Sequence, residues 1–181
     1  MSRIGRLPVP LPKGVTVAIE GNDITVKGPR GELKRTLPPD MTARTQDGKL
    51  LVSRPSDSRQ HRALHGLTRS LLAGMVEGVT NGFQKSLEIV GVGFRAQKEG
   101  DALVFQLGFT HPVKVPPMPG ISFVLEGTNK VTVTGINKEL VGQTAANLRA
   151  IKPPDHYKGK GIRYSGEYVR LKAGKALSKK K

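Results

Sequence analysis

Two histidines on one predicted helix are the first candidates for metal chemistry. His61 and His65 lie four residues apart, a spacing that can place both imidazoles on one helix face and hold Zn²⁺. Their turn carries no acid, which a metalloprotease site would need, and the arginines beside it would repel a cation. We therefore expect no metal and no cofactor, but a polar face that is either solvated or rests on phosphate. Its members are Arg59, Arg62, His65 and Arg69.

No recognisable catalytic motif occurs elsewhere in the sequence. The carboxylates are scattered, and there is neither a Gly-x-Ser-x-Gly elbow nor a phosphate loop ending in Gly-Lys-Ser/Thr. Gly91 and Gly93 only superficially resemble a dinucleotide fingerprint, because its third glycine is absent, so a bulge or close backbone packing explains them better. The sequence has no cysteine, which excludes disulfides and cysteine nucleophiles. We predict that the protein is not an enzyme.

Glycines alternate with cations in the segment 153–175. Small residues leave a backbone open, so cationic side chains and main-chain N–H groups can approach a phosphate ribbon closely. The segment also holds all three tyrosines of the chain, each of which could either pack on a sugar or base or anchor the loop. The predicted nucleic-acid-binding residues of this segment are Tyr157, Lys158, Gly159, Lys160, Gly161, Arg163, Arg170, Lys172 and Lys175.

The charge of the chain points to a polyanionic partner. The 181 residues include 30 Lys and Arg against 14 Asp and Glu, a formal net charge of +16. Residues 148–181 hold 11 of these cations and only 2 of the acids. Such clustering favours a nucleic acid, whose condensed counterions are released on binding. Because only 8 residues are aromatic, we expect contacts mainly through charge, backbone and shape.

Two stretches of alternating apolar and polar residues predict β-hairpins that arose by duplication. Residues 15–28 and the following Glu32-Leu33 align with residues 121–135 and Glu139-Leu140. Apolar residues at three- and four-residue steps predict a helix with each copy, over 63–79 and 140–151, with Asp57 and Asn137 as candidate N-caps. Further strand-like runs lie at 49–53, 86–92, 102–108 and 113–115. We predict an α+β fold of two homologous small domains, each an antiparallel-rich sheet packed with a helix.

A glycine-rich join at 78–82 separates the two copies. We expect an N-terminal α+β domain over 1–82, a C-terminal RNA-binding α+β domain over 83–175 and a basic tail over 176–181. The sequence contains no apolar run of the length that a signal peptide or a membrane span needs. We therefore expect a cytoplasmic protein with no membrane and no small-molecule partner.

Several of these motifs resemble the L-six family of large-subunit ribosomal proteins. The pattern Pro-Asp-x-Tyr-Lys-Gly-Lys-Gly-Ile occupies 154–162, with His156 where many bacterial members carry proline. The other matching positions are Ser2 to Arg6 with Pro8 and Pro12, Lys27 to Gly31, Gly91 to Gly93, Arg163-Tyr164, Glu167, Val169, Arg170, Lys172 and Gly174-Lys175. The resemblance covers the whole chain.

The resemblance implies more than the residues do. It implies a bacterial-type structural protein, monomeric within the large ribosomal subunit, that contacts neighbouring ribosomal proteins. It also implies binding to ribosomal RNA near the sarcin-ricin loop and the stalk base. The residues alone leave two alternatives, a DNA-binding architectural protein and a nucleic-acid-processing enzyme, the second of which needs a carboxylate cluster or a positioned histidine.

Overall fold

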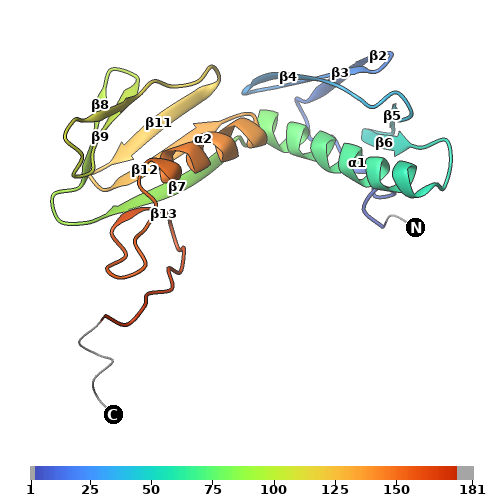
Figure 1. The fold of residues 1–181 in the computed structure, drawn as a ribbon. Helices are drawn as coiled ribbons and strands as arrows, with labels where there is room; N and C mark the ends of the chain where they lie inside the picture. The colour runs from blue at the N-terminus through green and yellow to red at the C-terminus, as the bar shows by residue number, and fades with distance from the viewer. Residues whose placement is uncertain (1–2, 175–181) are drawn as a thin grey trace. The chain divides into compact units, whose positions relative to one another are not determined.

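The computed structural model describes residues 3–174 of the chain (Figure 1). Lys175 and the predicted basic tail 176–181 lie outside the described residues. The chain divides into two compact units. The first holds the residues up to Phe83 together with Ile136–Lys138, and the second holds Gln84–Gly135 together with the residues from Glu139 onward. That the segments 1–82 and 83–175 fold as independent domains stays a prediction.

Two small antiparallel sheets and one long helix form the first unit. Its elements are β1 (Val9–Pro10), β2 (Thr16–Glu20), β3 (Asp23–Gly28), β4 (Gly31–Thr36), β5 (Thr42–Gln46), β6 (Lys49–Ser53) and α1 (Arg59–Thr80). The strand orders are β2-β3-β4 and β1-β6-β5. Leu72 and Val79 of α1 are buried together with Ile24, Val26 and Leu50 of the strands, so one core fixes α1 along both sheets (Figure 1).

The second unit also combines two sheets with one helix. Its elements are β7 (Phe83–Val90), β8 (Arg95–Glu99), β9 (Ala102–Gln106), β10 (Val113–Val115), β11 (Ile121–Glu126), β12 (Lys130–Gly135), α2 (Lys138–Ile151) and β13 (Gly161–Tyr164). The strand orders are β10-β9-β8 and β11-β12-β7-β13. The edge strand β13 pairs antiparallel with β7, so that Arg163 lies opposite Glu88. This pairing joins the glycine- and lysine-rich segment to the sheet.

The two units share one connectivity, which confirms the α+β fold with an internal duplication. In each unit a three-stranded meander is followed by a hairpin and a helix, namely β2-β3-β4, β5-β6 and α1, then β8-β9-β10, β11-β12 and α2. The strand before each meander, β1 or β7, lies beside the second strand of the hairpin. Duplication therefore extends over every layer of the fold.

The predicted alignment of the two hairpins is wrong. Residues 15–28 form β2 and β3 of the first meander, whose counterpart is β8 and β9, whereas 121–135 correspond to β5 and β6. The matching turns are Glu20-Gly21-Asn22 and Glu99-Gly100-Asp101, in which both glycines have a φ of 61°. The shared Glu-Leu pair also fails, because Glu32-Leu33 lies in β4 and Glu139-Leu140 in α2. Period-two alternation is common to all these hairpins and could not distinguish them.

The helix ends differ slightly from prediction. Ser58, not Asp57, caps α1, because the Ser58 hydroxyl accepts a hydrogen bond from the His61 N–H at 3.1 Å while Asp57 pairs with Arg54. Asn137 directly precedes α2, which ends at Ile151 before the Pro-Pro pair, as predicted. The turn between β7 and β8 shows the predicted close packing, since a Cβ on Gly91 would lie 2.6 Å from the Phe94 ring.

Candidate nucleic-acid interface

The segment after α2 is folded around one aspartate. The Asp155 carboxylate accepts a hydrogen bond from the Lys158 N–H at 3.1 Å, and the Asp155 carbonyl accepts one from the Gly159 N–H at 3.0 Å. The Asp155 N–H in turn donates to the Lys160 carbonyl at 2.9 Å. The backbone N–H of Lys158 is the main cause that lowers the pKa of the Asp155 carboxyl. These main-chain donors are therefore used within the loop, in contrast to the prediction that they approach phosphate.

The two glycines of the motif serve the loop itself. Gly159 and Gly161 are both buried. Gly161 has a φ of 144°, and a Cβ there would lie 2.6 Å from the Pro153 carbonyl oxygen and 2.7 Å from that of Lys152. Here the chain crosses its own backbone, and the Ile162 N–H donates to the Lys152 carbonyl at 2.7 Å. The predicted open backbone is thus a closed crossing, with the Ile162 side chain buried directly after it.

Two glutamates pair with two arginines of this region. Arg149 donates from Nε and Nη2 to the Glu167 carboxylate at 3.0 and 2.5 Å, and Arg163 donates from the same two atoms to Glu88 at 3.3 and 3.2 Å. The pKa of each glutamate is lowered, mainly by the Ser165 hydroxyl for Glu88 and by Arg149 for Glu167. The predicted phosphate ligand Arg163 is therefore neutralised within the fold.

Four other cations of the segment have no acidic partner. Among the residues that the structure describes, no carboxylate lies within salt-bridge distance of them: Lys158, Lys160, Arg170 and Lys172. Lys160 is half-buried and the other three are exposed. Two more lysines lie over aromatic rings, Lys85 at 5.1 Å from the Tyr164 ring centre and Lys152 at 4.6 Å from that of Phe109. The result is a cationic surface on a hydrogen-bonded frame.

The three tyrosines divide between the two predicted roles. Tyr164 is half-buried between the Lys85 ammonium and the Arg149 guanidinium, 5.1 and 5.6 Å from its ring centre, and its N–H donates to Glu167 at 2.9 Å. It anchors the loop. Tyr157 and Tyr168 are 60% and 89% exposed. Of the three tyrosines, these two have rings that are accessible to a sugar or base.

The predicted polar face of α1 is assembled only in part. Arg59 and Arg62 are exposed, but Arg69 is half-buried and donates from Nε to the Leu7 carbonyl at 3.1 Å. His65 is 4% exposed, so its placement on the outer face is wrong. The buried line of α1 runs through His65, Thr68, Leu72, Met75 and Val79, whereas Leu67 of the predicted apolar stripe is 53% exposed.

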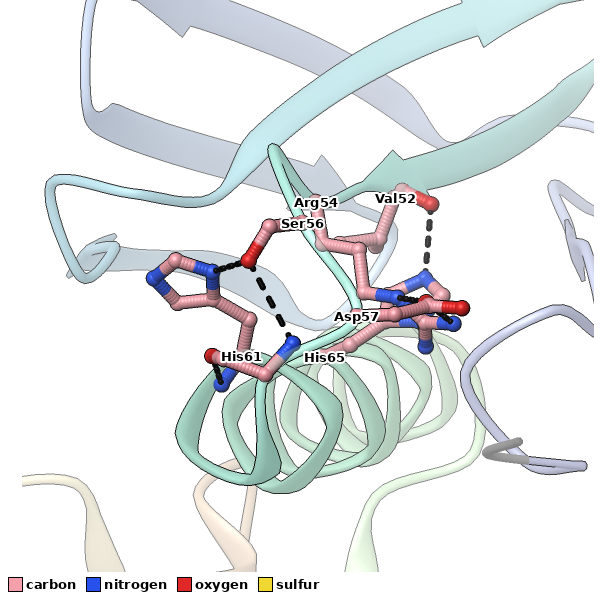
Figure 2. Close-up of polar contacts among 7 residues, drawn as sticks. Val52, Arg54, Ser56, Asp57, His61 and His65 are labelled. Atoms are coloured by element: carbon pink, nitrogen blue, oxygen red, sulfur yellow. Dashed lines mark hydrogen bonds and ion pairs between the residues drawn. The ribbon is translucent and has the colours of Figure 1, made fainter.

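His65 joins α1 to the strand before it. Figure 2 shows its Nε2 beside the Val52 carbonyl, at 2.9 Å, and its Nδ1 beside Arg54, at 3.0 Å from Nη1. A guanidinium only donates, so Nδ1 accepts and the proton of the neutral ring resides on Nε2. Arg54 is held in turn by Asp57 at 2.5 Å. Because both ring nitrogens of this buried histidine have partners inside the fold, His65 has a structural role.

The two histidines of α1 do not share a site. The His61 Nδ1 lies 2.7 Å from the Ser56 hydroxyl, on another side of the helix from His65 (Figure 2), and its Nε2 lies 3.6 Å from the Asp40 carboxylate. Within residues 3–174, no group of three or more His, Cys, Asp or Glu side chains could hold a metal ion. No helix in the same range is long and apolar enough to cross a membrane.

Comparison with known proteins gives one consistent family. The profile of the family described as ribosomal protein L6 matches residues 11–82 and 90–165, one segment for each copy of the duplication. Large ribosomal subunit protein uL6 of Halalkalibacterium halodurans is 58% identical over 97% of this chain and 98% of its own. The proteins of the same name from Moorella thermoacetica and Synechococcus sp. strain JA-3-3Ab are each 55% identical, over 99% and 100% of this chain and 98% and 100% of their own. The chain therefore belongs to the ribosomal protein L6 family, whose members are structural components of the large ribosomal subunit and not enzymes.

Proposed function

We propose that this protein binds ribosomal RNA of the cytoplasmic large subunit mainly through the second unit, near the sarcin-ricin loop and the stalk base. The RNA-binding surface rests on four cations that have no acidic partner in the described part of the chain: Lys158, Lys160, Arg170 and Lys172. They lie on a frame in which glutamates neutralise Arg149 and Arg163. Cations without protein partners are available to phosphate oxygens. The location rests on the family resemblance of the loop 154–162.

The frame matters because RNA binding requires the cations to stay in place. The crossing at Gly161, the Asp155 turn and the two Arg–Glu pairs fix the backbone beneath the four cations. A preorganised surface loses less conformational entropy on binding than a flexible chain does. Arg59 and Arg62 of α1 remain candidate RNA contacts of lesser weight, as does the exposed Tyr157. Lys175, also predicted to bind RNA, lies outside the described residues.

The chain offers a direct test of location because it contains no cysteine. A single cysteine can be introduced by Ala173→Cys, at an exposed position next to Lys172, and tethered to an iron chelate that cleaves RNA nearby. After incorporation into large subunits, we expect cleavage in the sarcin-ricin loop and the stalk base. Ser70→Cys, on the exposed surface of α1, is the matched control and should give a different pattern. Cleavage from Ala173→Cys confined to other regions of the RNA would refute the location.

A separate measurement tests the class of partner. Co-sedimentation with large subunits after a moderate salt wash, and competition between structured ribosomal RNA and duplex DNA, distinguish a ribosomal protein from a DNA-binding architectural protein. We expect ribosomal RNA to compete more strongly. Family membership excludes the nucleic-acid-processing enzyme, and we further propose that the protein is monomeric in the subunit beside neighbouring ribosomal proteins.

A further inference from the structure

A cavity of about 390 Å³ lies within the second unit, between the Pro-Pro turn after α2 and the segment that follows β13. Arg149 and Glu167 line it together with Pro154 and His156 on one side and Tyr168 and Arg170 on the other. Its volume is at the lower end of the range of ligand pockets, about 300–1,000 Å³. The unpaired cations Lys158 and Lys172 belong to the same loop, so the cavity opens within the proposed RNA-binding region.

The walls of the cavity are formed before any ligand binds. The Lys172 N–H donates to the His156 carbonyl at 2.7 Å and joins the two segments that face each other. The Glu167 N–H donates to the Tyr164 carbonyl at 3.0 Å, and the Glu167 carboxylate is held by Arg149. A ligand would therefore enter an existing space and would not have to order the loop.

The chemistry of the lining selects a flat and uncharged ligand. The Tyr168 ring is 89% exposed at the rim, and Pro154 adds an apolar surface. Arg149 uses Nε and Nη2 for Glu167, and its Nη1 has no acceptor among residues 3–174, so this donor is available to a carbonyl oxygen. Inside the cavity Arg149 and Glu167 neutralise each other, so a neutral group suits the space beside them, whereas Arg170 remains for an anion at the rim. A neutral ring with a polar edge suits all of these groups.

We propose that the cavity receives one unpaired nucleobase of ribosomal RNA, which stacks on Tyr168 and directs a carbonyl edge to Arg149. Arg170 at the rim contacts the phosphate of the same nucleotide. Stacking on aromatic side chains and reading of exposed base edges are the usual means by which proteins recognise single-stranded RNA. This site rests on the proposed function, and it adds one base-specific contact to a surface that otherwise contacts phosphates.

The test uses the full chain and refolded, protein-free large-subunit RNA. Tyr168→Ala should weaken affinity about 5- to 150-fold, the range expected when one stacked base is removed. The dependence of affinity on salt should not change, because no charge is removed. Tyr168→Phe keeps the ring and should retain wild-type affinity within about twofold. Val92→Ala removes another exposed side chain, 90% exposed in the turn between β7 and β8, and should bind as wild type.

Chemical probing of base edges in the same complexes identifies the inserted base. Wild-type protein and the Val92→Ala variant should protect one base that becomes reactive in the complex with Tyr168→Ala. Wild-type affinity of Tyr168→Ala, or an unchanged protection pattern at reduced affinity, would overturn the nucleobase site and leave the proposed function intact. Failure of the wild-type protein itself to bind the RNA would instead overturn the proposed function.

Discussion

The first turns of α1 and the loop after α2 both carry closely spaced cations, yet the fold uses them differently. In the first unit, Arg69 binds a backbone carbonyl and Arg54 binds a histidine and an aspartate, whereas Arg59 and Arg62 point outward, with no acidic partner in the described part of the chain. In the second unit, the glutamates neutralise Arg149 and Arg163 and leave Lys158, Lys160 and Lys172 without an acidic partner among residues 3–174. The comparison indicates that candidate RNA contacts are better chosen by asking which cations lack a protein partner than by counting cations.

The glutamates that neutralise Arg149 and Arg163 are distant from them in sequence. Glu88 stands 75 residues before Arg163, and Glu167 stands 18 residues after Arg149. Only the pairing of β13 with β7 brings the first pair together. The two regions can therefore be separated experimentally, because each depends on contacts within its own unit.

The largest effect is expected from disrupting the first unit alone. A Cβ on Gly78 of α1 would overlap the Ile136 backbone carbonyl, whereas a Cβ on Gly74 would meet nothing within 4 Å. Gly78→Ala should lower the free energy of unfolding by about 3 kcal/mol, and Gly74→Ala should raise it by up to about 1 kcal/mol. Urea denaturation measures both. If RNA affinity falls in step with the stability of Gly78→Ala, binding does not reside mainly in the second unit.

An intermediate effect is expected from the ion pair that holds the C-terminal loop. Glu167→Gln should destabilise the protein by about 1–2 kcal/mol at neutral pH, the cost of losing hydrogen bonds to a charged group. Because the pKa of Glu167 is lowered in the folded state, its contribution is present above the ordinary glutamate pKa of about 4.3 and disappears as the pH falls through the lowered value.

Urea midpoints between pH 6 and pH 3 measure this contribution. The wild-type midpoint should fall more steeply with acidification than that of Glu167→Gln. The matched change in the first unit is Asp57→Asn, at a carboxylate whose side chain is 72% exposed beside Arg54, and it should have a smaller effect. Parallel pH profiles for wild type and Glu167→Gln would show that the pair does not stabilise the loop.

The smallest expected effect is a difference in stability between variants of two arginines of α1. Arg69→Ala removes a charged donor from the Leu7 carbonyl and should cost about 1 kcal/mol. Arg62→Ala removes an exposed side chain and should cost no more than about 0.5 kcal/mol. Thermal or urea unfolding of the two single variants checks the difference. Equal stabilities would mean that the contact between Arg69 and the Leu7 carbonyl does not stabilise the fold and that Arg69 is as free as its neighbour.

The sequence predicted the fold class and many of its elements because their signals are local. The strands 49–53 and 113–115 coincide with β6 and β10, and α2 ends before Pro153 as predicted. The correct correspondence between the strands of the two repeats was missed because it depends on the order in which the strands are connected, which a local sequence pattern does not show. The Glu-Gly-Asn and Glu-Gly-Asp turns at 20–22 and 99–101 were the signal that could have revealed it.

The candidate site was only partly predictable for a related reason. Composition located the basic loop as a cationic surface, but it could not show that Gly159 and Gly161 are buried or that Arg163 is paired. His65 was missed because a polar residue on a helix was assigned to solvent, whereas Val52 and Arg54 satisfy both ring nitrogens inside the fold. The cavity beside Tyr168 depends on a backbone hydrogen bond between Lys172 and His156 that no local pattern records.

We propose that the unpaired cations of the second unit carry most of the binding to ribosomal RNA. The most direct test measures affinity for large-subunit RNA against salt concentration for wild type, for the combined Lys158→Ala, Lys160→Ala, Arg170→Ala and Lys172→Ala variant, and for Arg59→Ala with Arg62→Ala. The slope of log affinity against log salt should become shallower by up to about 0.7–0.9 for each phosphate that is no longer neutralised. We predict that the four-residue variant flattens the slope more, per removed cation, than the α1 variant does. A wild-type slope in the four-residue variant, with a shallower slope in the α1 variant, would contradict the claim.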